Sequence, residues 1–294
     1  MFLRWRYKGQ KMDKGTLYLC ATPIGNLEDI TLRVIRTLKE VDYIVAEDTR
    51  HTLKLLNHLD ISKPLISYHK YSNEQKEEKI LSLLEEGNNI ALVSDAGMPG
   101  ISDPGEELVK IAHKRNIHVT VLPGATAGLS ALVLSGLPTS RFVFEGFLPR
   151  DKKIRKEILN QLKGEERTII IYEAPHHLLG TLKDLHEVLG NRRLAVVREL
   201  TKIYEEVLHF TLEESIEYYS KNPPKGEFVL VIEGGKEEKE DNWFNHISIT
   251  DHILVYMDKG LSKKEAIKKV AADRDLPKSQ VYKHSIHIPG KNKD

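Results

Sequence analysis

Three short apolar runs in the first half of the chain each end in a loop rich in proline and glycine, and a helical stretch follows each loop. The runs span residues 17–21, 90–93 and 119–122, and their loops read T-P-I-G-N-L, S-D-A-G-M-P-G-I-S-D-P-G and P-G-A-T-A-G. A short apolar run bounded by turn residues predicts a buried strand. In open α/β sheets, ligands bind at the carboxyl ends of the strands. The pattern therefore predicts three loops that converge on one rim of a sheet.

The same alternation of strand and helix runs through the whole first half. We expect further strands at residues 43–46, 64–68 and 142–145, and helices at 31–40, 52–59, 74–86, 106–115 and 126–134. Such alternation predicts a mostly parallel sheet with helices on both faces. A stretch that combines proline with charge at 147–153 is typical of a linker. We therefore expect an N-terminal α/β domain over residues 16–146.

The second half restarts as a smaller α/β domain, expected over residues 151–235. Strands are predicted at 168–172, 194–197, 207–210 and 228–232, helices at 154–162 and 178–189, and the spacing favours mixed strand directions. The charged stretch 234–241 predicts a flexible linker. Beyond it, helices at 247–259, 263–272 and 278–284 predict a small basic helix-turn-helix-like module over residues 243–294. Its second helix begins with a capping box formed by Ser262 and Glu265.

Composition narrows the class of protein without naming it. The chain has 294 residues, a net charge of +1 and a single cysteine, Cys20, so it forms no internal disulfide and suits a reducing, cytoplasmic compartment. The sequence has no run of 18 apolar residues, so no membrane span is expected. Residues 1–15 are basic and lack an apolar core. We interpret them as a disordered leader, or as an extension upstream of a natural start at Met12.

Several common catalytic motifs are missing from the sequence. Neither G-x-G-x-x-G nor G-x-x-x-x-G-K-[ST] occurs, which argues against dinucleotide and ATP sites. There is no H-E-x-x-H and no pairing of cysteine with histidine, so no metal is expected. No G-x-S-x-G marks a serine nucleophile. In their place, polar clusters follow four predicted strands, at 47–51, 69–70, 173–176 and 198–202. Together with the three loops they predict a polar cleft, in which Asp95 could accept bonds from hydroxyls or amines.

The three loops resemble the motifs of the tetrapyrrole methylase superfamily. The strings A-E-D-T-R at 46–50 and Y-E-A-P-H at 172–176 narrow the resemblance to the branch that methylates a cytidine ribose 2′-oxygen in the decoding centre of 16S ribosomal RNA. In the tetrapyrrole enzymes the first loop usually reads G-x-G-P-G-D, and T-P-I-G-N departs from that pattern. The resemblance covers residues 16–235 and includes the C-terminal helical module.

The resemblance implies two α/β domains that hold S-adenosyl-L-methionine in the cleft between them. It also implies a homodimer that acts on 16S rRNA or the small ribosomal subunit. The residues that match cofactor-contacting positions are Pro23, Asp95, Ala96, Gly97, Met98, Ile101, Thr126, Ala127, Tyr172, Ala174 and Leu200.

Methyl transfer to a ribose requires its hydroxyl to lie in line with the sulfonium, and a nearby base assists because a protonated hydroxyl is a poor nucleophile. The candidate bases are Asp48, His69 and Glu173. Arg50 completes the predicted catalytic cluster, and Lys70, Arg198 and Lys202 are further candidates for holding phosphates.

Two other functions fit the same sequence. One is a methyltransferase of this fold that acts on a corrin or sirohaem-type tetrapyrrole, which a visible-absorbing ligand on purification would favour. The other is a non-enzymatic nucleic-acid-binding protein that works through the C-terminal module, which a lack of adenosylmethionine binding would favour. The module itself has two interpretations, RNA capture by its lysines or packing alone.

Overall fold

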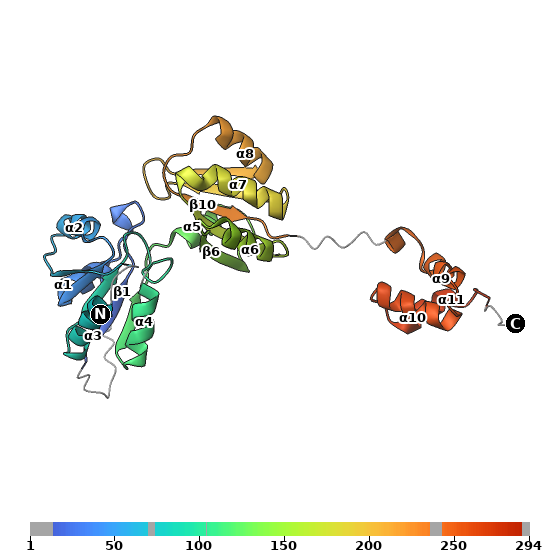
Figure 1. The fold of residues 1–294 in the computed structure, drawn as a ribbon, viewed down its shortest axis with the longest axis horizontal. Coiled ribbons are helices and arrows are strands. Elements are labelled where there is room, and N and C mark those ends of the chain that lie inside the picture. Colours follow the sequence, from blue (N-terminus) through green and yellow to red (C-terminus); the bar gives the residue numbers. More distant parts are fainter. Residues whose placement is uncertain (1–13, 70–73, 104, 236–242, 290–294) are drawn as a thin grey trace. The chain divides into compact units, whose positions relative to one another are not determined.

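The structure is a computed structural model, and it describes residues 14–69, 74–103, 105–235 and 243–289. The chain divides into two compact units, Met1–Gly235 and Lys236–Asp294, which are drawn in Figure 1. The predicted leader lies almost wholly outside the described residues, as do Lys70 and most of the predicted linker. Within the described part of the chain, no helix is long and apolar enough to cross a membrane.

The first sheet is parallel throughout, with strand order β3-β2-β4-β1-β5. This confirms the parallel sheet expected from the alternation of strands and helices. The elements of this part are β1 (Thr16–Cys20), η1 (Leu27–Asp29), α1 (Leu32–Glu40), β2 (Tyr43–Ala46), α2 (Thr49–His58), β3 (Leu65–Ser67), α3 (Glu74–Glu85), β4 (Ile90–Val93), α4 (Gly105–Lys114), β5 (His118–Leu122) and α5 (Ala127–Leu134).

Both faces of the first sheet are buried, because successive side chains of a strand point to opposite sides. On β4, Ile90 and Leu92 pack against α3 and α4, whereas Ala91 and Val93 pack against α1 and α2. With both faces covered, only the ends of the strands are open to a ligand.

The second sheet is mixed, with order β6-β7-β10-β8-β9, and only β6 and β7 run parallel. Helices α6, α7 and α8 cover one face, and α5 covers the other through Ala131 and Leu132. Its elements are β6 (Phe142–Phe147), α6 (Lys152–Leu162), β7 (Thr168–Glu173), α7 (Pro175–Leu189), β8 (Arg193–Arg198), β9 (Glu206–Thr211), α8 (Leu212–Lys221) and β10 (Phe228–Ile232).

The structure departs from the expected organisation at β6. The alternation of strands and helices places this strand in the first half, yet it forms an edge of the second sheet. The reason is that α5, which precedes β6 in the chain, already packs on the second sheet, so the chain has crossed to that sheet before β6 begins. Helix α8 is absent from the sequence-based expectations. It starts where β9 ends, at Thr211, whose side chain makes a capping box with Glu214.

The C-terminal unit is a bundle of three helices around its own apolar core. A 3-10 turn, η2 (Trp243–His246), leads into α9 (Ile249–Asp258), α10 (Lys263–Asp273) and α11 (Lys278–Ser285). Ile253, Val270 and Val281 are fully buried at its centre. The predicted capping box of Ser262 and Glu265 is present at the start of α10.

Candidate cofactor cleft and active site

The three proline- and glycine-rich loops meet, as the sequence predicted. Thr22 in the first loop and Gly97 in the second exchange two backbone hydrogen bonds, of 2.9 and 3.1 Å. Gly97 has a φ of +80°, which favours glycine because an L side chain is strained there. A Cβ built on it would lie 3.4 Å from the Ala125 carbonyl of the third loop. The loops therefore form one continuous wall.

This wall closes one side of a cavity of about 430 Å³, and the second sheet supplies the other side. Ten of the eleven residues predicted to contact the cofactor line it, and Pro23 does not. The lining consists of Ile24, Glu47, Ser94, Asp95, Ala96, Gly97, Met98, Ile101, Ser102, Asp103, Thr126, Ala127, Phe147, Tyr172, Glu173, Ala174, Pro175, Val197, Leu200, Lys202, Glu227, Phe228 and Val229.

A group of carboxylates gives the first-sheet wall its charge. Asp95 lies two residues after the end of β4, and its Oδ1 accepts the backbone N–H of Asp48 at 3.1 Å. Asp103 is held by the backbone N–H groups of Gly100 and Gly105, each at 2.8 Å. Burial raises the pKa of Asp103 against the effect of these bonds.

Glu47 completes the carboxylate group, although it is not among the bases predicted from the sequence. It follows the last residue of β2 and lines the cavity. Burial raises the pKa of Glu47, and the nearby carboxylates of Asp95 and Asp103 raise it further. The acidic string at 47–48 contained the signal, but the sequence could not tell which of its two acids faces the cavity.

Asp48 has a different position, outside the cavity lining. Its carboxylate caps α2 by accepting the Arg50 backbone N–H at 2.8 Å, and it forms a two-point ion pair with the Arg50 guanidinium. The hydrogen bonds from Arg50 hold the pKa of Asp48 well below its usual range. The Arg50 side chain is 87% exposed. Thus the structure brings these two residues together, but beside the cavity.

His69 and Glu173, the other two candidate bases, lie in different surroundings. His69 is near enough to lower the pKa of Glu47 electrostatically, but it does not line the cavity. Glu173 does line the cavity, at the end of β7, and its side chain is buried. Its carboxylate accepts the Ala174 backbone N–H at 2.8 Å and the Thr181 hydroxyl. These contacts fix the start of α7, which begins at Pro175 and not at Leu178 as predicted.

Tyr172 ties the third loop to the second sheet. Its hydroxyl oxygen accepts the backbone N–H of Gly128 at 2.9 Å, in the first turn of α5. Its ring packs edge-to-face against Phe144 and Phe147 of β6. The residue therefore fixes where α5 begins relative to the cavity wall.

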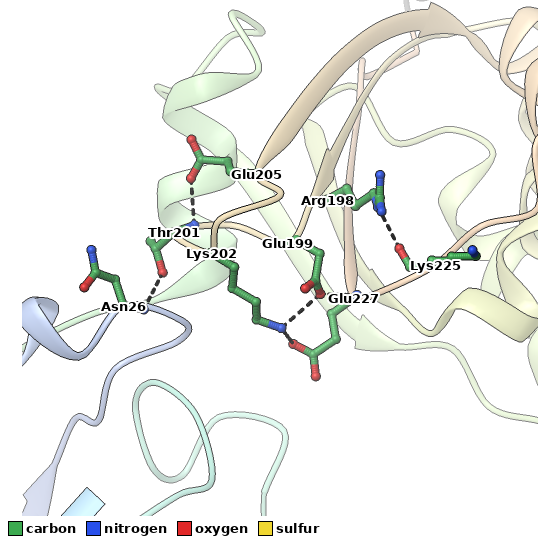
Figure 2. A network of polar contacts seen from close by, with 8 residues as sticks. All are labelled: Asn26, Arg198, Glu199, Thr201, Lys202, Glu205, Lys225 and Glu227. Atoms are coloured by element: carbon green, nitrogen blue, oxygen red, sulfur yellow. Dashed lines mark hydrogen bonds and ion pairs between the residues drawn. The ribbon is translucent and has the colours of Figure 1, made fainter. Parts of the chain in front are cut away.

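The turn after β8 forms the rim of the cavity on the second-sheet side, and Figure 2 shows its polar contacts. The Lys202 ammonium lies 2.9 Å from Glu199 and 3.0 Å from Glu227. Burial lowers the pKa of Lys202, but its hydrogen bonds to the two carboxylates outweigh this and leave the pKa raised. Arg198 points away and donates to the Lys225 carbonyl at 2.7 Å.

The same turn contacts the first loop directly. The Asn26 backbone N–H donates to the Thr201 hydroxyl at 3.1 Å, and Thr201 has a left-handed φ of +64°. Gly25 makes this approach possible. A Cβ on Gly25 would lie 2.5 Å from Lys202 Cγ and 2.9 Å from the Leu200 carbonyl oxygen. We call this contact between residues 25–26 and 200–202 the rim clasp.

Comparison with known proteins identifies the family to which the chain belongs. A model of the family described as tetrapyrrole (corrin/porphyrin) methylases matches residues 16–216. A relative from Halalkalibacterium halodurans, named ribosomal RNA small subunit methyltransferase I, is 54% identical over 93% of this chain and 95% of its own length. A Bacillus subtilis relative of the same name is 50% identical over 95% and 96%. A Thermotoga maritima relative of that name, 47% identical, is covered over 99% of its length but matches only 75% of this chain.

Solved structures agree on the fold. The methyltransferase CobJ aligns with a TM-score of 0.58 at 18% identity, over 75% of this chain and 95% of its own. Uroporphyrin-III-C-methyltransferase from Thermus thermophilus aligns with a TM-score of 0.54 at 20% identity, over 75% and 94%. The two sheets, the cleft between them and the sequence relatives all lead to one conclusion: the chain belongs to the tetrapyrrole methylase family, in the group whose curated members are ribosomal RNA small subunit methyltransferases I.

Proposed function

We propose that this protein transfers a methyl group from S-adenosylmethionine to a cytidine ribose 2′-oxygen in the decoding centre of 16S rRNA. The observation that carries the proposal is the cavity between the two sheets, lined by the loops that mark the family. The relatives that resemble the whole chain are named for small subunit rRNA. The acceptor atom rests on the strings A-E-D-T-R and Y-E-A-P-H, whose glutamates both line the cavity.

The lining of the cavity suits this cofactor chemically. Glu47, Asp95 and Asp103 place negative charge where a sulfonium and an ammonium require it, and Ile24, Leu200 and Val229 offer apolar contact to an adenine ring. S-adenosylmethionine supplies an electrophilic methyl group when bound. The protein's task is to align the acceptor hydroxyl, exclude water and remove the hydroxyl proton.

Glu47 is the base that we propose for the hydroxyl proton. Burial and like charges raise its pKa, and a raised pKa brings a carboxylate closer to the basicity that proton abstraction needs. Asp103 also has a raised pKa, but its oxygens already accept the backbone N–H groups of Gly100 and Gly105. Asp48 is less suited, because its ion pair with Arg50 makes it a weaker base. Glu173 is less suited, because its oxygens already accept two hydrogen bonds.

The experiment is methyl transfer from tritiated S-adenosylmethionine to unmodified 16S rRNA and to isolated small subunits. We expect tritium in RNA, and an internucleotide bond at the labelled site that resists alkali, because alkaline cleavage needs a free 2′-hydroxyl. Label confined to base atoms would contradict the acceptor. Label in a tetrapyrrole but not in RNA would contradict the substrate. Running both RNA substrates also decides between free rRNA and the assembled subunit.

We further propose that the protein works as a homodimer in the cytoplasm, where its RNA substrate is. Support for the dimer comes from the apolar side chains that α5 and β6 expose, among them Leu129, Val133 and Phe142. Strand β6 is also an edge of its sheet. Exposed apolar surface at a sheet edge favours association. Val133 is 74% exposed, and Val133→Lys is expected to shift the protein toward monomer in sedimentation equilibrium. An unchanged dimer would place the interface elsewhere.

A further inference from the structure

The C-terminal unit contains a groove between α10 and α11 that the chemistry above does not use. Its volume is about 860 Å³. Five lysines line it: Lys263 at its edge, and four that we call the groove lysines, Lys264 and Lys268 from α10 and Lys278 and Lys283 from α11. Ile267 and Tyr282 complete its apolar surface. Lys264 and Lys268 are one helical turn apart, as are Lys278 and Tyr282, so each helix presents a coherent face to the groove.

The positive charge of this groove is not neutralised within the described residues. None of the described residues that line it is acidic, and in the described part of the chain the four groove lysines make no ion pair. Lys269, on another face of α10, differs because it lies 3.5 Å from Asp273. Lys263, at the groove edge, donates to the Ile288 carbonyl at 2.6 Å. The groove therefore attracts a polyanion, and its lysines are available to contact phosphates.

Tyr282 adds an exposed aromatic ring to the groove, which the attraction of a polyanion by charge does not require. It is 59% exposed, although an aromatic ring is usually buried, and it lies among the lysines. An exposed ring between cations matches the way proteins bind single-stranded nucleic acid, with the backbone held by lysines and a base stacked on the ring.

The geometry of RNA favours a single strand over a duplex here. The recognition helix of a helix-turn-helix protein enters the major groove of B-DNA. The major groove of A-form RNA is too deep and narrow for side chains to read, so α11 could not bind an RNA duplex in that way. In a single strand the bases are exposed and reach a ring at the protein surface.

We propose that the groove between α10 and α11 binds single-stranded RNA, with Lys264, Lys268, Lys278 and Lys283 on the phosphates and an unpaired base stacked on Tyr282. The choice of RNA over another polyanion rests on the proposed function. The stacking and the charge pattern rest on the groove itself.

The test uses the full chain and a short fluorescein-labelled single-stranded RNA, with an RNA duplex of the same sequence for comparison. The variants are Tyr282→Ala, Tyr282→Phe, and a quadruple variant in which the four groove lysines become glutamine. Lys269→Gln is the matched control, since it removes a lysine from the same helix but outside the groove. Anisotropy titrations over a range of salt give affinity and its salt slope, and thermal unfolding checks that each variant is folded.

We expect the quadruple variant to bind single-stranded RNA more weakly, with the salt slope shallower by about 1 for each phosphate that a lysine no longer binds. Tyr282→Ala is expected to lose about 5- to 150-fold in affinity for the single strand, the equivalent of one stacked base, and Tyr282→Phe to keep it. Wild-type affinity and slope in the folded quadruple variant would overturn the site. An equal loss on duplex and single strand, without rescue by phenylalanine, would overturn the stacking.

The same preparations separate this inference from the proposed function. If the wild type methylates rRNA and the groove variants bind RNA normally, the groove inference alone fails. If the groove variants lose RNA binding but the wild type transfers no methyl group to rRNA, the proposed function alone fails.

Discussion

At the scale of single residues, the cavity is distinguished by its carboxylates. Asp95 and Asp103 lie close enough to Glu47 for their charges to raise its pKa, and Lys202 at the far rim already contacts two carboxylates. Such mutual repulsion costs stability, and ionisable groups with perturbed pKa values are typical of functional sites. A cationic ligand would stabilise this arrangement, because the positive charge of the ligand offsets the repulsion between the carboxylates.

Glu47 provides the first prediction, on the pH dependence of the methyl transfer rate. A base acts in its ionised form, so the single-turnover rate should increase with pH through the raised pKa of Glu47, above the usual value for glutamate of about 4.3. Glu47→Gln should lose about 10²- to 10⁴-fold in rate at saturating cofactor and abolish this dependence. Asp48→Asn should keep most of the rate and change the unfolding temperature little, because asparagine keeps the side-chain acceptor that caps α2 and loses only the ion pair with the exposed Arg50. The reverse pattern would make Asp48 the base.

Asp95 provides the second prediction, on cofactor affinity. Its carboxylate lines the cavity while one oxygen holds the Asp48 backbone N–H. Asp95→Ala should weaken S-adenosylmethionine binding by about 1–3 kcal/mol, the scale of a lost buried hydrogen bond to a charged group. Asp95→Asn keeps an acceptor for the Asp48 N–H and should recover part of the loss. Calorimetry that found wild-type affinity in a folded Asp95→Ala variant would exclude Asp95 from cofactor binding.

At the scale of elements, the rim clasp joins a loop of the first sheet to a turn of the second, so the shape of the cleft depends on both sheets. Gly25 should tolerate no side chain, because a Cβ would meet Lys202 and the Leu200 carbonyl oxygen. Gly25→Ala is therefore expected to push the turn after β8 outward, at a cost of about 1–3 kcal/mol in stability, and to weaken cofactor binding. Gly180→Ala in α7 is the matched control for a glycine change in this unit, since its Cβ would meet nothing within 4 Å and its φ is not left-handed. Equal cofactor affinities in the two variants would argue against the clasp.

Local patterns predicted most of these elements, and the failures have physical causes. Short apolar runs ending in proline and glycine indicated β1, β4 and β5 and their convergence. Helix α8 was missed because no turn residue separates it from β9, since Thr211 both ends the strand and caps the helix. The sheet to which β6 belongs depends on pairing with β7, which no local pattern encodes. Glu47 was missed because neighbouring side chains near a strand end point in different directions.

At the scale of the whole molecule, the two units of the chain have separate apolar cores. The cavity lies wholly within Met1–Gly235, whereas the lysine groove lies in Lys236–Asp294, which has its own buried cluster. About a quarter of this chain has no counterpart in the Thermotoga maritima relative, although that relative shares its name with the relatives that match more than nine-tenths of the chain. The cavity and the lysine groove are therefore expected to be separable by mutation.

Truncation after Gly235 tests this separation. The shortened protein keeps every residue that lines the cavity, so its affinity for S-adenosylmethionine should equal that of the full chain. It lacks the groove lysines, so the KM for RNA should rise and the slope of log affinity against log salt should become shallower, because fewer counterions are released. Turnover at saturating RNA should change little, since substrate capture and chemistry lie in different units. An unchanged RNA affinity and salt slope would assign the C-terminal unit to packing, while a loss of cofactor binding would show that the first unit depends on it to fold.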